Sequence, residues 1–236
     1  MSDWAAKRFW DAASVAPADG GFTVHLDARP LRTPGKSALI VPTHDMASAI
    51  AAEWDAQTGK IDPNTMPVTR AANSAIEKVM SQKDAVIDEL SGYGKSDLIC
   101  YRATGPEALI DQQKAAWDPW LAWAANALDA TLVTTQGVMP VDQPAAAIAR
   151  LRDAVAQMDA FQLAGFHELV TISGSLVLSL AVTADKLSPQ EAWDLSRVDE
   201  LWQISQWGED EEASAHAARK CQAFLAGARF FQLCLT

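Results

Sequence analysis

The sequence predicts an α+β protein, with a small N-terminal α+β domain containing hairpins at residues 1–62 and a larger all-α helical-bundle domain at residues 63–236. Two observations predict this organisation. Up to residue 43, short apolar alternations are interrupted by Asp-Gly-Gly, Arg-Pro, Thr-Pro-Gly and Val-Pro. This pattern is typical of hairpins, because Gly permits positive φ and Pro ends strand pairing. Beyond residue 43, the apolar residues recur mostly at helical spacing.

The first helix is predicted to begin after Thr43, whose hydroxyl can cap it, and to end at Gly59. Met46, Ile50 and Trp54 form its apolar stripe. The IDPNTMP segment that follows contains two prolines and predicts a turn. Residues 68–94 then have the pattern of one interrupted helix or of two consecutive helices.

The remainder of the chain predicts further helices and two short strands. SDLICYRA, at residues 96–103, and TLVTTQG, at residues 131–137, are the strand candidates. Residues 106–128 predict a helix that Pro119 either kinks or divides. Four more helical stretches are expected, at residues 144–158, 161–184, 188–208 and 211–235. The uncharged run within the second of these is shorter than the roughly 20 residues of a membrane span, so it predicts a buried helix.

Charge and cysteine content exclude several classes of function. The net charge of −11 argues against a nucleic-acid partner, which would need clustered Lys and Arg, and against attraction to anionic membranes. It is compatible with a protein partner. Cys100, Cys221 and Cys234 include no CxxC pair and indicate a reducing compartment. The segment MSDWAAKRFW lacks the apolar region of a secretory signal, so the protein is expected to remain where it is made.

None of the motifs that resemble catalytic or metal-binding signatures is complete. Two Gly-Lys-Ser turns, at residues 35–37 and 94–96, lack the earlier glycine of a phosphate-binding loop. His167-Glu168 begins like a zinc-binding HExxH motif, but Thr171 stands where the second histidine is required. Cys100 has apolar neighbours, among which a thiol is normally inert. The sequence therefore predicts no enzyme activity, no cofactor and no metal site.

The segment Ser196–Glu212, SRVDELWQISQWGEDEE, combines two tryptophans with many carboxylates. At helical spacing, Leu195, Val198 and Trp202 form the apolar stripe of an amphipathic helix, beside which Arg197 can pair with a neighbouring carboxylate. The acids that follow the Trp-Gly break can favour the next helix through its dipole, or they can surround an aromatic contact for a partner. Helical periodicity does not decide between these interpretations.

Five segments of the chain form a recognisable series. They are RPLRTPGKSALIVPT (29–43), EWDAQTGKIDPNTMPVTRAANSAIE (53–77), SDLICYRA (96–103), WDPWLAWA (117–124) and LSRVDELWQISQWGEDEEA (195–213). Together, and in this order, they resemble the F₁-ATPase assembly chaperones, which hold the α subunit of ATP synthase before it joins the β subunit. Each segment is weak alone, but the five in sequence make a specific match along most of the chain.

The resemblance implies a non-catalytic function for the two-domain fold. Such a chaperone binds the unassembled α subunit of F₁-ATPase, covers the surface that α later buries against β, and prevents aggregation. A non-catalytic scaffold or regulatory protein with a different protein partner is the alternative that the residues leave open. The protein is expected to be a monomer without membrane insertion, in the bacterial cytoplasm, whereas eukaryotic relatives would act in the mitochondrial matrix.

The resemblance also implies which residues matter. Family comparison places a functionally sensitive glutamate in the motif matched by SRVDELWQ, and that role falls on Glu200, whose carboxylate could meet an arginine of the α subunit. Trp54 is the second sensitive position; its helical spacing predicts a core position that joins the two domains, so that its loss would act through folding. The expected supporting neighbours of the glutamate are Asp199, Arg197, Gln203 and Trp207.

Overall fold

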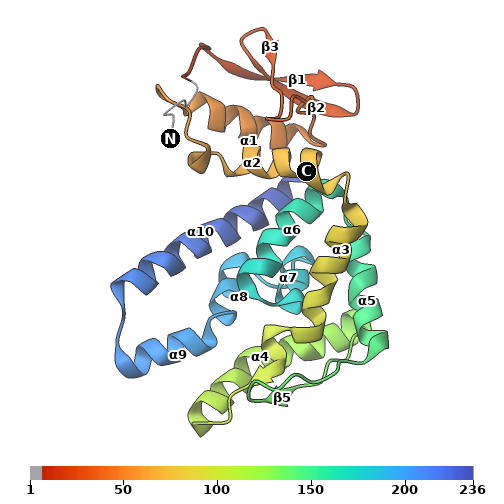
Figure 1. Cartoon of the computed structure of the whole chain (residues 1–236), viewed down its shortest axis with the longest axis vertical. Helices are drawn as coiled ribbons and strands as arrows, with labels where there is room; N and C mark the ends of the chain where they lie inside the picture. Colours follow the sequence, from red (N-terminus) through yellow and green to blue (C-terminus); the bar gives the residue numbers. More distant parts are fainter. Residues whose placement is uncertain (1–6, 236) are drawn as a thin grey trace. The chain divides into compact units, whose positions relative to one another are not determined.

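The computed structural model describes residues 7–235, which form two compact units (Figure 1). The N-terminal unit contains the described residues up to 83, together with residues 160–165 and 229–235. The helical unit contains residues 84–159 and 166–228. The α+β class is therefore confirmed, with strands and hairpins gathered at the N-terminus and mostly helices after them.

The N-terminal unit is built on an antiparallel three-stranded sheet of order β1–β2–β3. Its strands are β1 (Ala13–Ala18), β2 (Gly21–Leu26) and β3 (Arg29–Pro30). The turn between β1 and β2 depends on Gly21, which has a φ of 155° and whose absent Cβ would collide with the carbonyl of Val41. No L side chain fits there, because Phe22 and Val41 exchange backbone hydrogen bonds of 2.9 and 2.8 Å beside it.

Helix α1 (His44–Asp55) packs on β1 and β2 and begins as the sequence predicts. Thr43 Oγ1 accepts a hydrogen bond of 3.2 Å from the backbone N–H of Met46, which satisfies one free donor of the first turn. Val24 and Ile50 are fully buried between helix and sheet. Their burial gives this small sheet the apolar face that it needs for stability.

The N-terminal unit extends to residue 83, beyond the expected boundary at residue 62. It includes the 3₁₀ turn η1 (Pro63–Thr65), α2 (Pro67–Ser74) and the π-helical turn η2 (Ala75–Val79). Glu53 of α1 explains the extension, because its two carboxylate oxygens accept hydrogen bonds of 2.7 and 2.8 Å from the backbone N–H groups of Val68 and Thr69. A side chain of α1 thus caps α2 and keeps it in the same unit.

The helical unit consists of helices with one short parallel strand pair. Its elements are α3 (Lys83–Gly92), η3 (Tyr93–Ser96), η4 (Leu98–Cys100), β4 (Tyr101–Arg102), α4 (Glu107–Leu128), β5 (Thr135–Gln136), α5 (Ala145–Ala156), α6 (Ala160–Ser173), α7 (Leu176–Thr183), α8 (Pro189–Leu195), α9 (Val198–Trp207) and α10 (Glu211–Leu233). The first residues of α6 and the last residues of α10 belong to the N-terminal unit. Each predicted strand segment contributes only a two-residue strand, and these pair with each other as β4 and β5. Much of the first predicted strand, residues 96–103, forms 3₁₀ turns instead. Helix α4 runs unbroken through Pro119.

The stretch 161–184 forms two helices, although the sequence predicted one. Gly174 has a φ of 70°, which ends α6, and Ser175 then caps α7 by accepting 3.1 Å from the N–H of Leu178. All residues of α7 from Leu176 to Val182 are buried, so α7 is the centre of the helical unit. Among residues 7–235, no helix is long and apolar enough to cross a membrane.

Candidate functional site

Helix α9 lies against α4 in the helical unit (Figure 1). The contact is fixed by Gln113 of α4, whose side chain has only 1% of its surface exposed. Its Nε2 donates to Asp199 Oδ1 at 2.6 Å, and its Oε1 accepts from the backbone N–H of Ala103 at 2.8 Å. A buried amide with both ends paired is a strong constraint, because leaving either end unpaired is costly. Asp199 is therefore a positioning residue that holds the first turn of α9.

Two side-chain hydrogen bonds also fix the junction between α8 and α9. Trp117 of α4 donates its Nε1–H to the carbonyl of Leu195 at 2.8 Å, and Ser196 Oγ donates to the carbonyl of Trp193 at 2.7 Å. These bonds satisfy carbonyls at the end of α8 and divide the predicted helix 188–208 in two. The guanidinium of Arg197 lies 5.2 Å from the centre of the Trp193 ring. Within the described part of the chain it forms no ion pair with a neighbouring carboxylate, contrary to the spacing-based expectation.

The outward face of α9 carries the other three expected contact residues. Glu200, Gln203 and Trp207 are all exposed, and their spacing of three and four residues places them on one side of the helix. Trp207 has 79% of its surface exposed. The opposite side contains the buried Val198 and the half-buried Trp202. We call Glu200, Gln203 and Trp207 the outer face of α9.

The acids between α9 and α10 have a local structural role. Gly208 has a φ of 89°, which ends α9. Asp210 Oδ1 accepts 2.7 Å from the N–H of Ala213, and Glu209 Oε1 accepts 2.6 Å from Ser214 Oγ. These carboxylates cap the start of α10, where negative charge is favourable. The helix-start interpretation therefore accounts for this cluster, whereas the carboxylate of Glu200 makes no comparable capping bond within residues 7–235.

Trp54 lies in α1, in the N-terminal unit, and is half-buried. Its ring meets Trp10 edge-on, with ring centres 5.2 Å apart, and both residues belong to the N-terminal unit. Aromatic pairs of this geometry add about 0.5–1.5 kcal/mol beyond the area they bury. This contact supports folding of the N-terminal unit.

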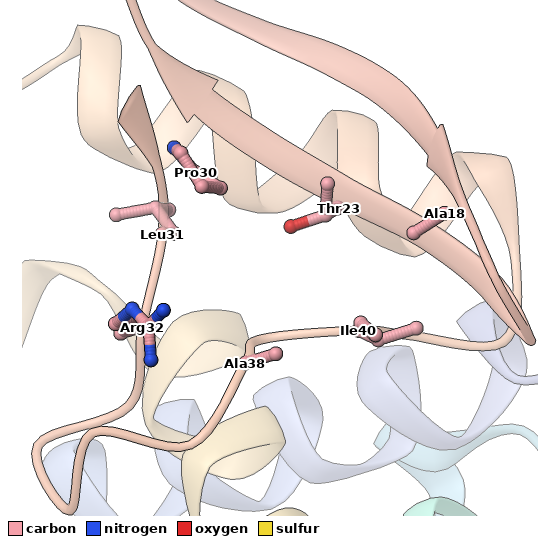
Figure 2. Close-up of a pocket in the computed structure, with 7 residues that line it drawn as sticks. All are labelled: Ala18, Thr23, Pro30, Leu31, Arg32, Ala38 and Ile40. Carbon is pink, nitrogen blue, oxygen red and sulfur yellow. The ribbon is translucent and has the colours of Figure 1, made fainter. Parts of the chain in front are cut away.

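A small hollow in the N-terminal unit has no arrangement suited to chemistry (Figure 2). Its two polar side chains are already engaged: Thr23 Oγ1 donates to the carbonyl of Leu39 at 2.7 Å, and Arg32 donates to the carbonyl of Lys36 at 2.9 Å. The other lining residues are apolar: Ala18, Pro30, Leu31, Ala38 and Ile40. Within residues 7–235, no three His, Cys, Asp or Glu side chains are placed to hold a metal ion.

Comparison with known proteins identifies the family. The family model described as ATP12 chaperone protein matches residues 7–125. A crystal structure of Atp12 from Paracoccus denitrificans matches with a TM-score of 0.94 at 49% identity, over 97% of this chain and 98% of that one. The chain belongs to the ATP12 chaperone family.

Three further proteins are also similar to this chain. A structure of a mutant of P. denitrificans Atp12p also has a TM-score of 0.94 at 49% identity, over 97% of this chain and 98% of that one. The Atu1473 protein of Agrobacterium tumefaciens has a TM-score of 0.93 at 40% identity, over 96% of this chain and 85% of that one. The mitochondrial protein atp12 of Schizosaccharomyces pombe is 24% identical over 219 residues, which cover 88% of this chain and 75% of the relative.

Within the ATP12 fold, the sequence pattern missed the residues that position α9. Gln113 lies 86 positions from Asp199, and a glutamine in a helix ordinarily indicates an exposed position. Trp117 carried a weak signal, since it begins the matched segment WDPWLAWA. Neither residue could be connected to α9 without the tertiary structure.

Proposed function

We propose that this protein is an assembly chaperone of ATP synthase that holds the unassembled α subunit of F₁-ATPase until the β subunit replaces it. The observation that carries the proposal is membership of the ATP12 chaperone family, supported by relatives that match nearly the whole chain. The exposed carboxylate and tryptophan of the outer face of α9 supply a surface of suitable chemistry.

The chemistry of this face suits reversible binding to an unpaired subunit. An unassembled subunit exposes apolar surface that otherwise aggregates, so its chaperone must cover that surface and later release it. An exposed tryptophan supplies a contact of large area, and tryptophan is enriched among residues that dominate binding energy. A carboxylate adds orientation and a fast association with a basic partner. Glu200 and Trp207 provide these two groups, and Gln203 lies between them.

The roles of the five expected residues then divide in two. Glu200, Gln203 and Trp207 are proposed to touch the α subunit. Asp199 and Arg197 act through the fold, since the first is bonded to Gln113 and the second stacks on Trp193. Loss of a positioning residue should weaken binding only to the extent that α9 moves.

The test is suppression of aggregation in separately refolded α and β subunits, followed by light scattering. Wild-type protein is expected to keep α soluble and to leave β unprotected. Glu200→Lys is expected to need at least about tenfold more protein for half-protection, because reversing a contact charge places like charges together. Glu89→Lys makes the same charge change at an exposed position of α3 and should behave as wild type. Asp199→Asn keeps an acceptor for Gln113 and should also protect α.

The outcomes separate the proposal from its alternatives. If Glu200→Lys and Glu89→Lys protect α equally well, the chaperone function stands and the outer face of α9 is not the contact. If wild type protects neither subunit, the alternative function, a scaffold or regulatory protein with another partner, is favoured. Unchanged thermal unfolding of Glu200→Lys would show that any loss belongs to binding.

A further inference from the structure

Residues 133–143, which include β5, form a loop whose two ends are joined by hydrogen bonds. The side-chain amide of Gln143 pairs with the backbone of Val133 in both directions, with two hydrogen bonds of 2.8 Å. In the N-terminal part of this loop, β5 pairs with β4, and Gly137 donates its N–H to the carbonyl of Arg102 at 2.8 Å. A loop with joined ends and internal pairing is a compact surface element, of a kind that frequently has a function.

The tip of this loop is apolar and exposed. Val138 has 90% of its surface exposed and Met139 has 72%. The stretch 131–144 contains no lysine or arginine, and Asp142 is its single charged residue. These two adjacent side chains add nothing to the core of the fold, so they are available for contact with another molecule.

Hydrogen bonds connect the loop to the first turn of α9. Gly137 bonds Arg102, the next residue Ala103 bonds Gln113, and Gln113 bonds Asp199, which precedes Glu200. The β4–β5 pair at the base of the loop and the first turn of α9 are therefore both linked to Gln113 of α4, inside one unit. Figure 1 shows α4, β5 and α9 together at the lower end of the helical unit.

We propose that Val138 and Met139 form a second, apolar anchor for the same partner that the outer face of α9 contacts. This inference rests on the proposed function. The partner surface that fits is an unassembled subunit with an exposed apolar interface and a basic side chain, because the chaperone presents an apolar loop tip and the exposed carboxylate of Glu200 on the same unit. Methionine is well suited to such a contact, since its flexible thioether adapts to irregular surfaces.

Charge argues against a lipid surface as the occupant of the tip. The chain has a net charge of −11 and no basic residue in residues 131–144, whereas binding to anionic membranes uses clustered Lys and Arg. A second copy of the chain would bring together two acidic molecules, each with the same exposed carboxylates on α9. A basic, apolar partner avoids both forms of repulsion.

The test uses the double variant Val138→Ser, Met139→Ser in the full-length protein. The matched control is Met80→Ser, which removes an apolar side chain that is 52% exposed in the N-terminal unit. The double variant is expected to need at least about tenfold more protein for half-protection of α, because it loses two apolar contacts. The control is expected to match wild type, and all three proteins should have the same thermal unfolding, because the substituted side chains are exposed.

The salt dependence of protection distinguishes the apolar contact of the loop tip from the charged contact of Glu200. At about 0.5 M NaCl exposed charges are strongly screened, so the defect of Glu200→Lys should shrink while the defect of the double variant persists. If the double variant and Met80→Ser protect α equally, the tip is not an anchor, although the proposed function stands. If wild type does not protect α at all, both proposals fail. A wild-type dimer that the double variant converts to a monomer would assign the tip to a second copy and overturn this inference.

Discussion

Asp97 lies in the interior of the helical unit, with none of its surface exposed. Its carboxylate accepts hydrogen bonds from the backbone N–H groups of Val177, at 2.9 Å, and of Ile99, at 3.2 Å, so it caps α7 from another part of the chain. Burial raises its pKa from 3.8 to about 6, and the bonds from Ser175 and the backbone only partly oppose this. Asp97 therefore couples the central helix to pH.

The sign of this coupling follows from proton binding. The folded protein keeps the Asp97 proton up to about pH 6, whereas the unfolded chain releases it near pH 3.8. The contribution of Asp97 to stability is thus complete below about pH 4 and is lost as the pH rises through 6. The loss is on the order of 2–3 kcal/mol.

We predict that Asp97→Asn abolishes this pH dependence. The amide does not titrate, so the free energy of unfolding of wild type should fall between about pH 4 and pH 6.5 relative to that of the variant. The amide also lacks one acceptor oxygen, which lowers stability by an amount that does not change with pH. Urea unfolding at a series of pH values measures both effects. A wild-type-to-variant difference that stays constant with pH would contradict the buried, titrating carboxyl.

For single residues of the candidate site, helical spacing in the sequence indicates which side chains share a face of α9, but it does not indicate their distant partners. Glu200, Gln203 and Trp207 share a face because of their positions in α9, which the sequence states directly. Asp199 was expected beside them as a supporting neighbour, and its attachment to Gln113 depends on a residue far away in the chain. Such pairings arise from tertiary packing and have no periodic signal.

Breaks between consecutive helices are the structural feature that the local sequence pattern indicates least well. The break between α6 and α7 had a signal, since Gly174 interrupts an apolar run, but the apolar pattern continues across it. The break between α8 and α9 has neither Gly nor Pro. It results from the bonds of Ser196 and Trp117, which compete with the helical pattern of backbone hydrogen bonds. In contrast, the cap at Thr43 could be predicted from the sequence, because a capping side chain acts within three residues of its own position.

Gly174→Ala is predicted to destabilise the protein by about 1–2 kcal/mol, because an L side chain is unfavourable in the left-handed region. Gly174 has a φ of 70°, and an added Cβ would meet only an ordinary contact with Leu98 at 3.8 Å. Backbone strain is therefore the sole expected cause. Gly92→Ala is the matched control, since Gly92 has a φ of −58° and open space around its Cα. It should leave stability unchanged or raise it by up to about 1 kcal/mol. Equal effects of the two variants in urea unfolding would refute the strain argument.

Polar side chains of the segment EWDAQTGKIDPNTMPVTRAANSAIE (53–77) connect the elements of the N-terminal unit by hydrogen bonds. Glu53 caps α2, and Gln57 bonds Thr65 at 2.9 Å and the N–H of Asp62 at 2.8 Å. Glu77 accepts a bond from the N–H of Gly35, and hydrogen bonding from Thr33 and then from Gly35 holds its pKa below the usual value. These polar residues therefore stabilise the fold of the N-terminal unit.

At the scale of the whole molecule, the N-terminal unit is assembled from three separate parts of the chain. Its core includes Phe161 and Leu163 from the start of α6, and Phe230 and Phe231 from the end of α10. Thr43 Oγ1 also donates to the carbonyl of Leu233 at 2.5 Å. The sequence pattern predicted a contiguous domain because local periodicity does not indicate which distant segments share a core.

We predict that a fragment of residues 1–83 does not fold cooperatively, even though it contains the whole sheet, α1 and α2. It lacks four large apolar side chains of its own core, and such losses usually exceed the small net stability of a unit of this size. A shorter fragment of residues 1–62 also lacks α2 and should fare worse. Circular dichroism during urea titration is the measurement, with the full-length protein as the reference. A sharp unfolding transition in the fragment 1–62 would restore the contiguous-domain interpretation.

The dispersed composition of the N-terminal unit sets an order for biosynthesis. A ribosome releases the hairpins and α1 before the helical unit, but residues 229–235, which complete the core of the N-terminal unit, are translated only after the helical unit. All residues of the helical unit lie between 84 and 228, so this unit is fully translated before residues 229–235 and can fold while translation continues. The core around the emerging N-terminal strands stays incomplete until residues 229–235 have emerged. A protein proposed to protect another subunit from premature association must therefore pass through an exposed, unfinished stage of its own.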